Sequence, residues 1–260
     1  FADGGALANG HYFCHTYAQM IPAARFYESH PEYFPLVKGR RFRSTQAHGQ
    51  LCYTSLGLED EMVRQYEMAI AGRPECVHYA CAANDNLDLD CECPACAKLI
   101  ASDGHVGAQL DLANRVSSRL ALKHPDILLK ATAYVATQDP PPNVRPGENV
   151  IVEYCPIQQR AGTDVYRPWR THAKIRDQFD AWLKIAPNMS VWDYALDWDM
   201  TPMPNFETMC DNIRFWRECG VKGVLIQEIE TNRVNLQELR AWVFAKLLWN
   251  PDYALESLVG

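Results

Sequence analysis

The chain has 260 residues, of which 48% are hydrophobic and 22% are charged, and this composition excludes disordered, collagen-like and coiled-coil proteins. The net charge is -7 and the basic residues do not cluster beyond Lys38–Arg43, so we expect no nucleic-acid partner. The longest apolar stretches, such as Ala241–Trp249, are too short and too often interrupted by charge to form a membrane span.

Short apolar runs alternate with amphipathic segments along the chain. The runs are typical of buried parallel strands, whereas the segments have apolar residues three and four positions apart, as helices do. We predict strands at Tyr12–Thr16, Cys76–Cys81, Ile127–Val135, Val150–Tyr154, Met189–Tyr194 and Gly223–Glu228. We predict helices at Leu58–Ala71, Ala108–Lys123, Ala173–Ile185, Phe206–Cys219 and Leu236–Trp249.

This alternation indicates parallel strands joined by right-handed crossovers, and the length suits one α/β barrel. Counted back from the C-terminus, the strands are numbers three to eight of a (β/α)8 TIM-type barrel, because Ala18–Tyr53 resembles one long loop. We therefore predict a single domain over residues 1–260, a barrel that lacks its first two strands and forms the C-terminal part of a longer protein.

Polar and aromatic residues follow the predicted strands, where a parallel barrel has its active site. These residues are His15, Asn84, Asp85, Tyr134, Glu153, Asp193, Tyr194, Trp198, Glu228 and Glu230. Such a set suits glycoside hydrolysis, which needs a carboxylic acid to protonate the leaving oxygen, a second carboxylate or the substrate's own amide, and aromatic platforms for sugar rings. The glycine-rich loops of nucleotide-binding proteins and the Gly-x-Ser-x-Gly elbow of serine hydrolases are absent, so we expect no cofactor.

Three acids are candidates for catalysis, and each has a structural alternative. Asp85 follows Asn84, whose amide could bind a sugar substituent while the acid donates a proton, but Asn-Asp-Asn is also a common turn. Glu153 interrupts an apolar strand, which is costly unless the carboxylate has a task or pairs with an arginine nearby. Asp193 also breaks a strand and either lies in the pocket or points at the helix layer.

The other candidates would bind substrate. Those expected to line the sugar subsites are His15, Tyr134, Tyr194 and Trp198. Glu228 and Glu230 could hydrogen-bond the substrate or instead cap the helix that follows them.

Ten cysteines are many for an enzyme of this size, and three of them lie in one short run. Cys91, Cys93 and Cys96 could form a four-thiolate zinc site together with Cys81 or Cys76. They could instead form disulfides that pin the loop after a strand, or remain free buried thiols. The run lacks the histidines and the open position of a catalytic zinc site, so we expect no catalytic metal.

Several linked segments resemble those of one family. They are His30–Arg40, Gln50–Cys52, the Asn84-Asp85 step before Cys91-x-Cys93-x-x-Cys96, and Ala245–Pro251. In them the chain is similar to a bacterial glycoside-hydrolase-like domain, long described as a domain of unknown function, from about His11 to Pro251. The resemblance implies a (β/α)8 hydrolase related to glycoside hydrolase family 163, endo-β-N-acetylglucosaminidases that act on N-glycans with retention.

The resemblance and the site residues together predict a glycoside hydrolase with a carbohydrate substrate. Asp85 would be the general acid/base, and the second carboxylate would be Glu153 or Asp193. The resemblance also implies an extracytoplasmic location, either periplasmic, on the cell surface or secreted. Two alternatives are a non-catalytic carbohydrate-binding domain and a zinc-dependent hydrolase that uses the cysteine run.

Overall fold

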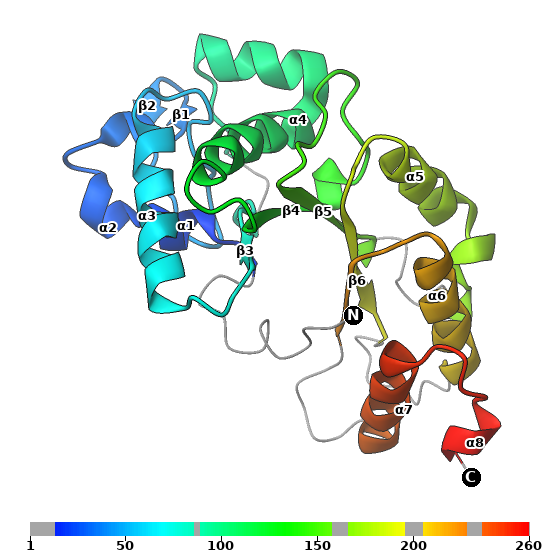
Figure 1. Ribbon diagram of the computed structural model, residues 1–260. Helices are drawn as coiled ribbons and strands as arrows, with labels where there is room; N and C mark the ends of the chain where they lie inside the picture. The colour runs from blue at the N-terminus through cyan, green and yellow to red at the C-terminus, as the bar shows by residue number, and fades with distance from the viewer. Residues whose placement is uncertain (1–13, 86–88, 158–165, 196–204, 228–235, 260) are drawn as a thin grey trace. The chain divides into compact units, whose positions relative to one another are not determined.

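The computed structural model describes most of the chain, namely residues 14–85, 89–157, 166–195, 205–227 and 236–259 (Figure 1). The chain forms two compact units. The N-terminal unit consists of Asp3–Glu153 and Ile185–Asn188, and the C-terminal unit consists of Phe1–Ala2, Tyr154–Lys184 and Met189–Gly260.

Five described strands form a parallel sheet in the order β3-β4-β5-β6-β7. Their bounds are His78–Ala80 for β3, Leu128–Tyr134 for β4, Val150–Cys155 for β5, Met189–Tyr194 for β6 and Gly223–Gln227 for β7. Each of these strands falls where the apolar runs predict one.

The helices lie between the strands where the amphipathic segments predict them, except that the helix predicted at Ala108–Lys123 already begins at Pro94. Additional helices precede β3. The longer ones are α3 (Leu58–Gly72), α4 (Pro94–Leu120), α5 (Ala173–Leu183), α6 (Phe206–Glu218) and α7 (Gln237–Trp249). The short ones are α1 (Tyr17–Met20), α2 (Ala23–Phe26), α8 (Glu256–Val259) and the 3-10 turns η1 (Pro31–Tyr33), η2 (Val135–Thr137) and η5 (Trp169–Thr171).

The prediction of a TIM-type (β/α)8 barrel is wrong. The described part of the expected strand at Tyr12–Thr16 is not extended into the sheet, and Thr16 instead precedes α1. The backbone N–H of Thr16 donates to the carbonyl of Ala82 at 3.0 Å, and its hydroxyl donates to the carbonyl of Ala80 at 3.0 Å. The hydroxyl of Tyr66 also donates to the carbonyl of Ala80, at 2.8 Å. The carbonyls of Ala80 and Ala82 are therefore already occupied and cannot accept hydrogen bonds from a further strand. The described residues therefore contain a five-stranded parallel sheet and no closed barrel.

The segment Ala18–Tyr53, which resembles one long loop in sequence, contains α1, α2 and a two-stranded antiparallel sheet of β1 (Leu36–Val37) and β2 (Arg40–Arg41). Lys38 and Gly39 join the two strands with φ values of 49° and 76°. Two successive positive φ values are what a two-residue hairpin turn requires, and the glycine supplies one of them at little cost.

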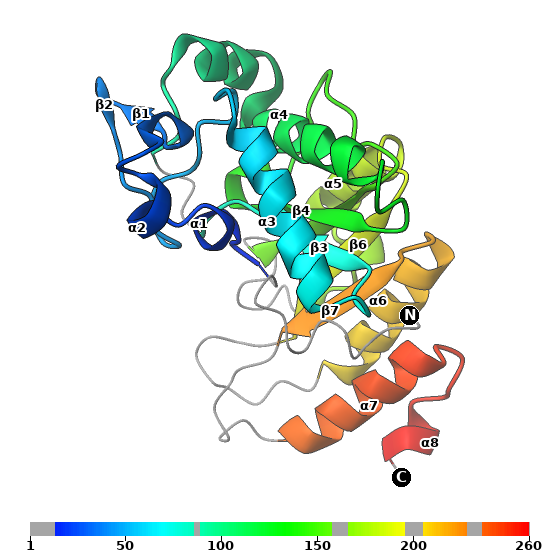
Figure 2. The ribbon, with the colours of Figure 1, turned by 60° about the vertical axis from the view of Figure 1, so that its left-hand side comes forward.

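In the N-terminal unit, α3 and α4 cover one face of β3 and β4 (Figures 1 and 2). The rings of Tyr66 in α3 and Tyr79 in β3 lie 6.4 Å apart, and both side chains are buried. Since side chains alternate along a strand, His78 and Ala80 lie on the opposite face of β3. Ala80 is in register with Lys130 of β4, so the face that is turned away from α3 and α4 also carries Lys130.

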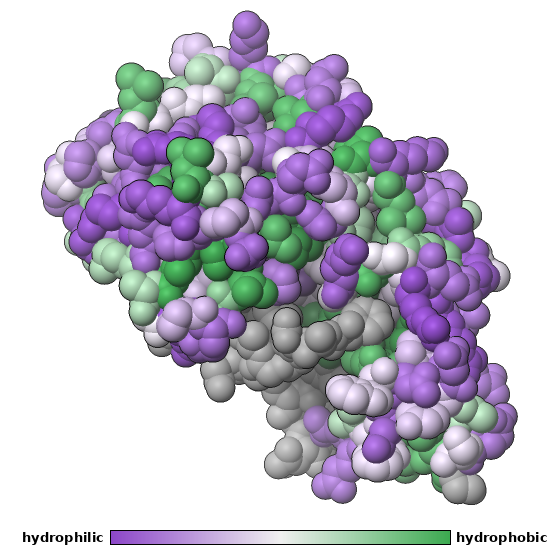
Figure 3. All heavy atoms as spheres, in the orientation of Figure 1, coloured by the Kyte–Doolittle hydropathy of each residue, from purple (hydrophilic) through white to green (hydrophobic). Residues whose placement is uncertain are grey.

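The outer surface of these helices is mixed. Met68 of α3 is 54% exposed, and Leu56 before α3 and Leu122 after α4 are 91% and 85% exposed. In Figure 3 the hydrophobic groups over α3 and α4 are scattered among hydrophilic ones. Single exposed apolar side chains are normal on globular proteins. None of the described helices combines the length and the apolar character that a membrane span needs.

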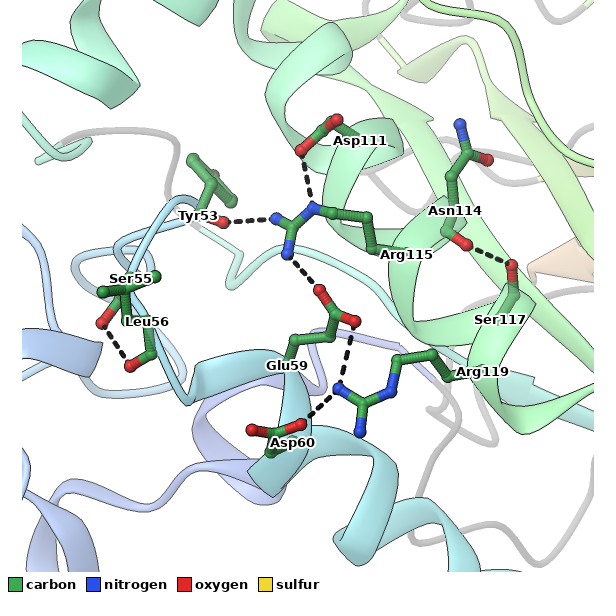
Figure 4. A network of polar contacts seen from close by, with 10 residues as sticks. All are labelled: Tyr53, Ser55, Leu56, Glu59, Asp60, Asp111, Asn114, Arg115, Ser117 and Arg119. Carbon is green, nitrogen blue, oxygen red and sulfur yellow. Dashed lines mark hydrogen bonds and ion pairs between the residues drawn. The ribbon is translucent and has the colours of Figure 1, made fainter. Parts of the chain in front are cut away.

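Two arginines of α4 hold the start of α3 (Figure 4). Arg115 donates to the carboxylate of Glu59 at 2.7 Å and to the carbonyl of Tyr53 at 2.6 Å. Arg119 donates to Glu59 at 3.1 Å and also pairs with Asp60. Both acids lie in the first turn of α3, where negative charge also suits the helix dipole.

The C-terminal unit has an aromatic core beside β6. Trp169 packs against Trp216 of α6 and Phe179 of α5, with ring centroids 5.1 and 5.4 Å away, and all three side chains are fully buried. Arg240 of α7 is 2% exposed and donates to the carbonyl of Ala195 at 2.9 Å. This bond ties α7 to the end of β6.

Asp103 lies at the bend of α4 and binds the loop between β4 and β5 through hydrogen bonds. The bend is at Gly104, whose φ of 70° and ψ of 179° are tolerated almost only by glycine. The Asp103 carboxylate accepts the backbone N–H groups of Asn143 and Val144 at 2.7 and 2.9 Å, and the hydroxyl of Ser102 at 2.8 Å. Burial raises the pKa of Asp103, but these hydrogen bonds outweigh it and hold the pKa below its ordinary value.

We expect Asp103→Asn to lower the free energy of unfolding by about 1–3 kcal/mol at pH 7, because the hydrogen bonds lose their charged acceptor. The pKa of this group is lower in the folded state than in the unfolded state. Its contribution is therefore complete above the unfolded pKa, about 4, and is lost as the pH falls through the folded pKa.

Urea unfolding of both proteins between pH 7 and 3.5 measures this difference. It should be constant down to about pH 5 and shrink in more acidic solution. The exposed Asp126 makes a matched control, for which Asp126→Asn should change little. A cost of Asp103→Asn that grows as the pH falls would contradict the assignment.

Candidate active site

The N-terminal unit brings His15, Asp85 and Tyr134 together beyond the ends of β3 and β4. Nε2 of His15 lies 3.2 Å from Oδ1 of Asp85, and Nδ1 lies 2.9 Å from the carbonyl oxygen of Ala83. The ring of Tyr134 meets the His15 ring edge-on, with centroids 5.9 Å apart. The sequence predicts all three residues as site residues, and the structure places them in contact.

The backbone sets the orientation of the His15 ring in the His15–Asp85 pair. A carbonyl can only accept, so Nδ1 of His15 carries a proton and donates it to Ala83. Nε2 of His15 then faces the Asp85 carboxyl group. The Asp85 side chain is 58% exposed and that of His15 is 18% exposed, so the Asp85 carboxyl group is within reach of a bound molecule.

The backbone is strained at His15 itself and at Val135, the residue after Tyr134. His15 and Val135 each have a φ of 51°, in the left-handed region. This region is unfavourable for a histidine and more so for a β-branched valine. Strained residues of this kind often belong to functional sites, where the surrounding structure maintains them.

Asn84 fixes the position of Asp85. Its side chain donates to the carbonyl of Gly49 at 2.7 Å and accepts the backbone N–H of Ala18 at 3.0 Å. Its backbone exchanges two hydrogen bonds with the side chain of Gln50, at 3.0 and 3.1 Å. Asn84 is 1% exposed, so these contacts make it a positioning residue, and its predicted contact with a sugar remains a prediction.

Glu153 forms an ion pair with Lys130, with Nζ and Oε1 2.8 Å apart. Their side chains are 3% and 5% exposed, so both charges are buried on the face of β4 and β5. The sequence predicts such a pair as the structural alternative for Glu153 but names arginine as the partner. Lysine in the apolar run Ile127–Val135 is the signal that identifies the actual partner.

Cys14 lies near all the charged groups of the site. Burial raises the pKa of its thiol to about 11, with Lys130 opposing the rise and Glu153 and Asp85 adding to it. The thiol therefore stays protonated at neutral pH and is a poor nucleophile. Of Cys14, His15 and Asp85, the acid Asp85 is therefore the better candidate for proton transfer, because its side chain is the more exposed, at 58% against 18% for His15.

Asp193 lies in the C-terminal unit and is fully buried. It accepts hydrogen bonds from Nε1 of Trp169 at 3.2 Å and from Nδ2 of Asn212 in α6 at 3.3 Å. These contacts match the alternative in which this acid points at the helix layer. Tyr194 is 4% exposed and stacks on Trp192 at 6.3 Å.

Three predicted substrate-binding residues lie outside the described residues, namely Trp198, Glu228 and Glu230. Their roles remain predictions.

The three cysteines of the predicted metal run lie together, with Cys52 as the fourth member of the group. All ten cysteines are free of disulfide bonds. The sequence suggests Cys81 or Cys76 as the fourth member, because both are closer along the chain. The segment Gln50–Cys52, which belongs to the family resemblance, is the signal that points to Cys52.

We expect Lys130→Met to lower the free energy of unfolding by about 3–5 kcal/mol, because the Glu153 carboxylate then stays buried without its ammonium partner. Adding Glu153→Leu should restore most of the loss. Urea unfolding measures all three proteins. Lys123→Met is the control, since it breaks the more exposed Lys123–Glu67 pair and should cost no more than about 1 kcal/mol. Equal costs for the two lysine variants would contradict a buried pair.

Comparison with known proteins identifies the family but no activity. No curated protein and no solved structure matches the chain. One family model matches residues 2–260, nearly the whole sequence. The chain therefore belongs to the family described as Domain of unknown function (DUF4838).

Proposed function

We propose that this protein hydrolyses glycosidic bonds in glycans that contain N-acetylglucosamine, with Asp85 as the general acid/base. The observation that carries the proposal is the 3.2 Å contact between His15 and an Asp85 side chain that is 58% exposed. A carboxyl group that is open to solvent on one side and contacts an imidazole on the other can act as the acid that protonates a leaving oxygen. It can then recover a proton from water.

The surroundings of Glu153 favour a route in which the substrate supplies the nucleophile. The Glu153 side chain pairs with Lys130 at 2.8 Å and is 3% exposed. A carboxylate that is buried and paired in this way suits electrostatic stabilisation of the site better than the role of a nucleophile that attacks the anomeric carbon. Some glycosidases use the substrate's own 2-acetamido group in place of a second carboxylate. That substrate class agrees with the resemblance to endo-β-N-acetylglucosaminidases, which also supports an extracytoplasmic location.

In this route the acetamido oxygen attacks the anomeric carbon while the glycosidic C–O bond breaks. The leaving oxygen takes the proton of Asp85, and an oxazolinium ion that keeps the acetamido N–H forms. Water then attacks the anomeric carbon and opens the oxazolinium ion, while the Asp85 carboxylate takes a proton from that water, which restores the starting state. The Tyr134 ring beside His15 offers an apolar face for a sugar ring.

Asp85→Asn tests the proposal in the full-length protein. With N-glycans or alkyl N-acetylglucosaminides, we expect kcat to fall by about 10²–10⁴-fold, because the leaving oxygen is then not protonated. With aryl N-acetylglucosaminides that have good leaving groups, the loss should be much smaller. Kinetics over a series of leaving groups measures this dependence, and Asp126→Asn serves as the control for an exposed acid outside the site.

Full activity of Asp85→Asn on every substrate that the wild type cleaves would overturn the assignment.

A second candidate function is carbohydrate binding without catalysis, which the pairing of Glu153 with Lys130 favours because it neutralises that carboxylate. It predicts saturable oligosaccharide binding that survives Asp85→Ala, and no product at any pH.

A further inference from the structure

Four cysteine sulfurs converge in the N-terminal unit. The Sγ atoms of Cys52, Cys91, Cys93 and Cys96 all lie within 4.8 Å of one another. The Sγ of Cys52 lies 3.7 Å from that of Cys93 and 3.9 Å from that of Cys96. Three of the four side chains are buried, and that of Cys93 is half-buried.

The spacing of the sulfurs matches one tetrahedral ion. Thiolates about 2.3 Å from a tetrahedral Zn²⁺ lie about 3.8 Å from one another, which is close to both of the separations above. A disulfide would bring two sulfurs to about 2.05 Å. An iron–sulfur cluster places sulfide between several irons and so spreads its cysteines further apart than a single ion does.

The start of α4 adds a second reason for anionic sulfur at this place. Cys93 is the N-cap of α4, Pro94 is its first residue, and Cys96 lies in its first turn. The N-terminus of a helix stabilises negative charge and favours thiolates. Cys-x-x-Cys at this position supplies half of a zinc site of the common spacing.

Neighbouring groups orient the sulfurs. The backbone N–H of Leu36 in β1 donates to the Sγ of Cys91 at 3.3 Å, and the hydroxyl of Thr54 lies 3.2 Å from the Sγ of Cys96. The guanidinium of Arg41 in β2 also lies beside Cys52 and brings a positive charge to the cluster. Hydrogen bonds from such an outer shell hold metal ligands in place and moderate their charge.

We propose that Cys52, Cys91, Cys93 and Cys96 bind one structural Zn²⁺. Four thiolates fill a tetrahedral ion completely and leave no position for substrate, so this ion stabilises structure and takes no part in hydrolysis. It joins the loop of Cys52 to the start of α4. The β1–β2 hairpin is fastened to the segment just before α4, because the backbone N–H of Glu92 donates to the carbonyl of Leu36 at 2.7 Å.

Metal analysis of the purified full-length protein tests this inference. We expect about one zinc per chain, and substitution with Co²⁺ should give the absorption spectrum of tetrahedral thiolate coordination. Cys52→Ser and Cys91→Ser should each lower the zinc content several-fold. Cys76→Ser and Cys81→Ser are matched controls, because both cysteines are buried in the same unit but lie outside the cluster, and these variants should keep the metal.

Measurements on the wild type keep the inference falsifiable if a cysteine variant fails to fold. Chelation of the ion under native conditions should make four additional thiols reactive toward an alkylating reagent, at the cluster cysteines as mapped by mass spectrometry. Zinc-free native protein, iron in place of zinc, or disulfides between these cysteines would each overturn the assignment. So would retention of zinc by Cys52→Ser together with its loss from Cys81→Ser.

Discussion

The arrangement of the N-terminal unit depends on the hydrogen bonds of one buried amide pair, Asn84 and Gln50. Asn84 binds Ala18 and Gly49, and its backbone is bound at both ends by the side chain of Gln50. Three segments that are distant in sequence are thereby joined at the end of β3. A buried amide that loses its hydrogen-bond partner lowers the stability of the fold. A shift of any one segment would break its hydrogen bonds to the other two and leave such groups unpaired.

The candidate site follows from this constraint. The next residue, Asp85, is held by a bond from its N–H to the carbonyl of Gln46, at 2.9 Å, and meets His15, which precedes α1. Cys52 lies two residues beyond Gln50, so the proposed zinc site would hold the same segment from its other end. The proposed metal site and the proposed catalytic acid are therefore separate in chemistry but share one framework.

Local patterns in the sequence predict most of the secondary structure. Strands such as Met189–Tyr194 and helices such as Phe206–Glu218 are evident from their apolar spacing, and Asp85 is evident from its place after a strand. The barrel prediction is wrong at Thr16, where a further strand is expected beside β3. The carbonyl of Ala80 accepts the hydroxyl of Thr16 instead of a backbone N–H from such a strand. The pairing of Lys130 with Glu153 and of Cys52 with the distant cysteine run depends on tertiary contacts that no local pattern contains.

Hydrogen exchange in an Asn84→Ala variant tests the central claim most directly, namely that one buried amide network positions the segments of the site. We expect faster exchange in three separate regions, Cys14–Met20, Gln46–Cys52 and Ala82–Asp85, because each loses a partner at the same time. Exchange in the middle of α3 should not change. Faster exchange confined to the residues beside position 84, with the other two segments unaffected, would contradict the account.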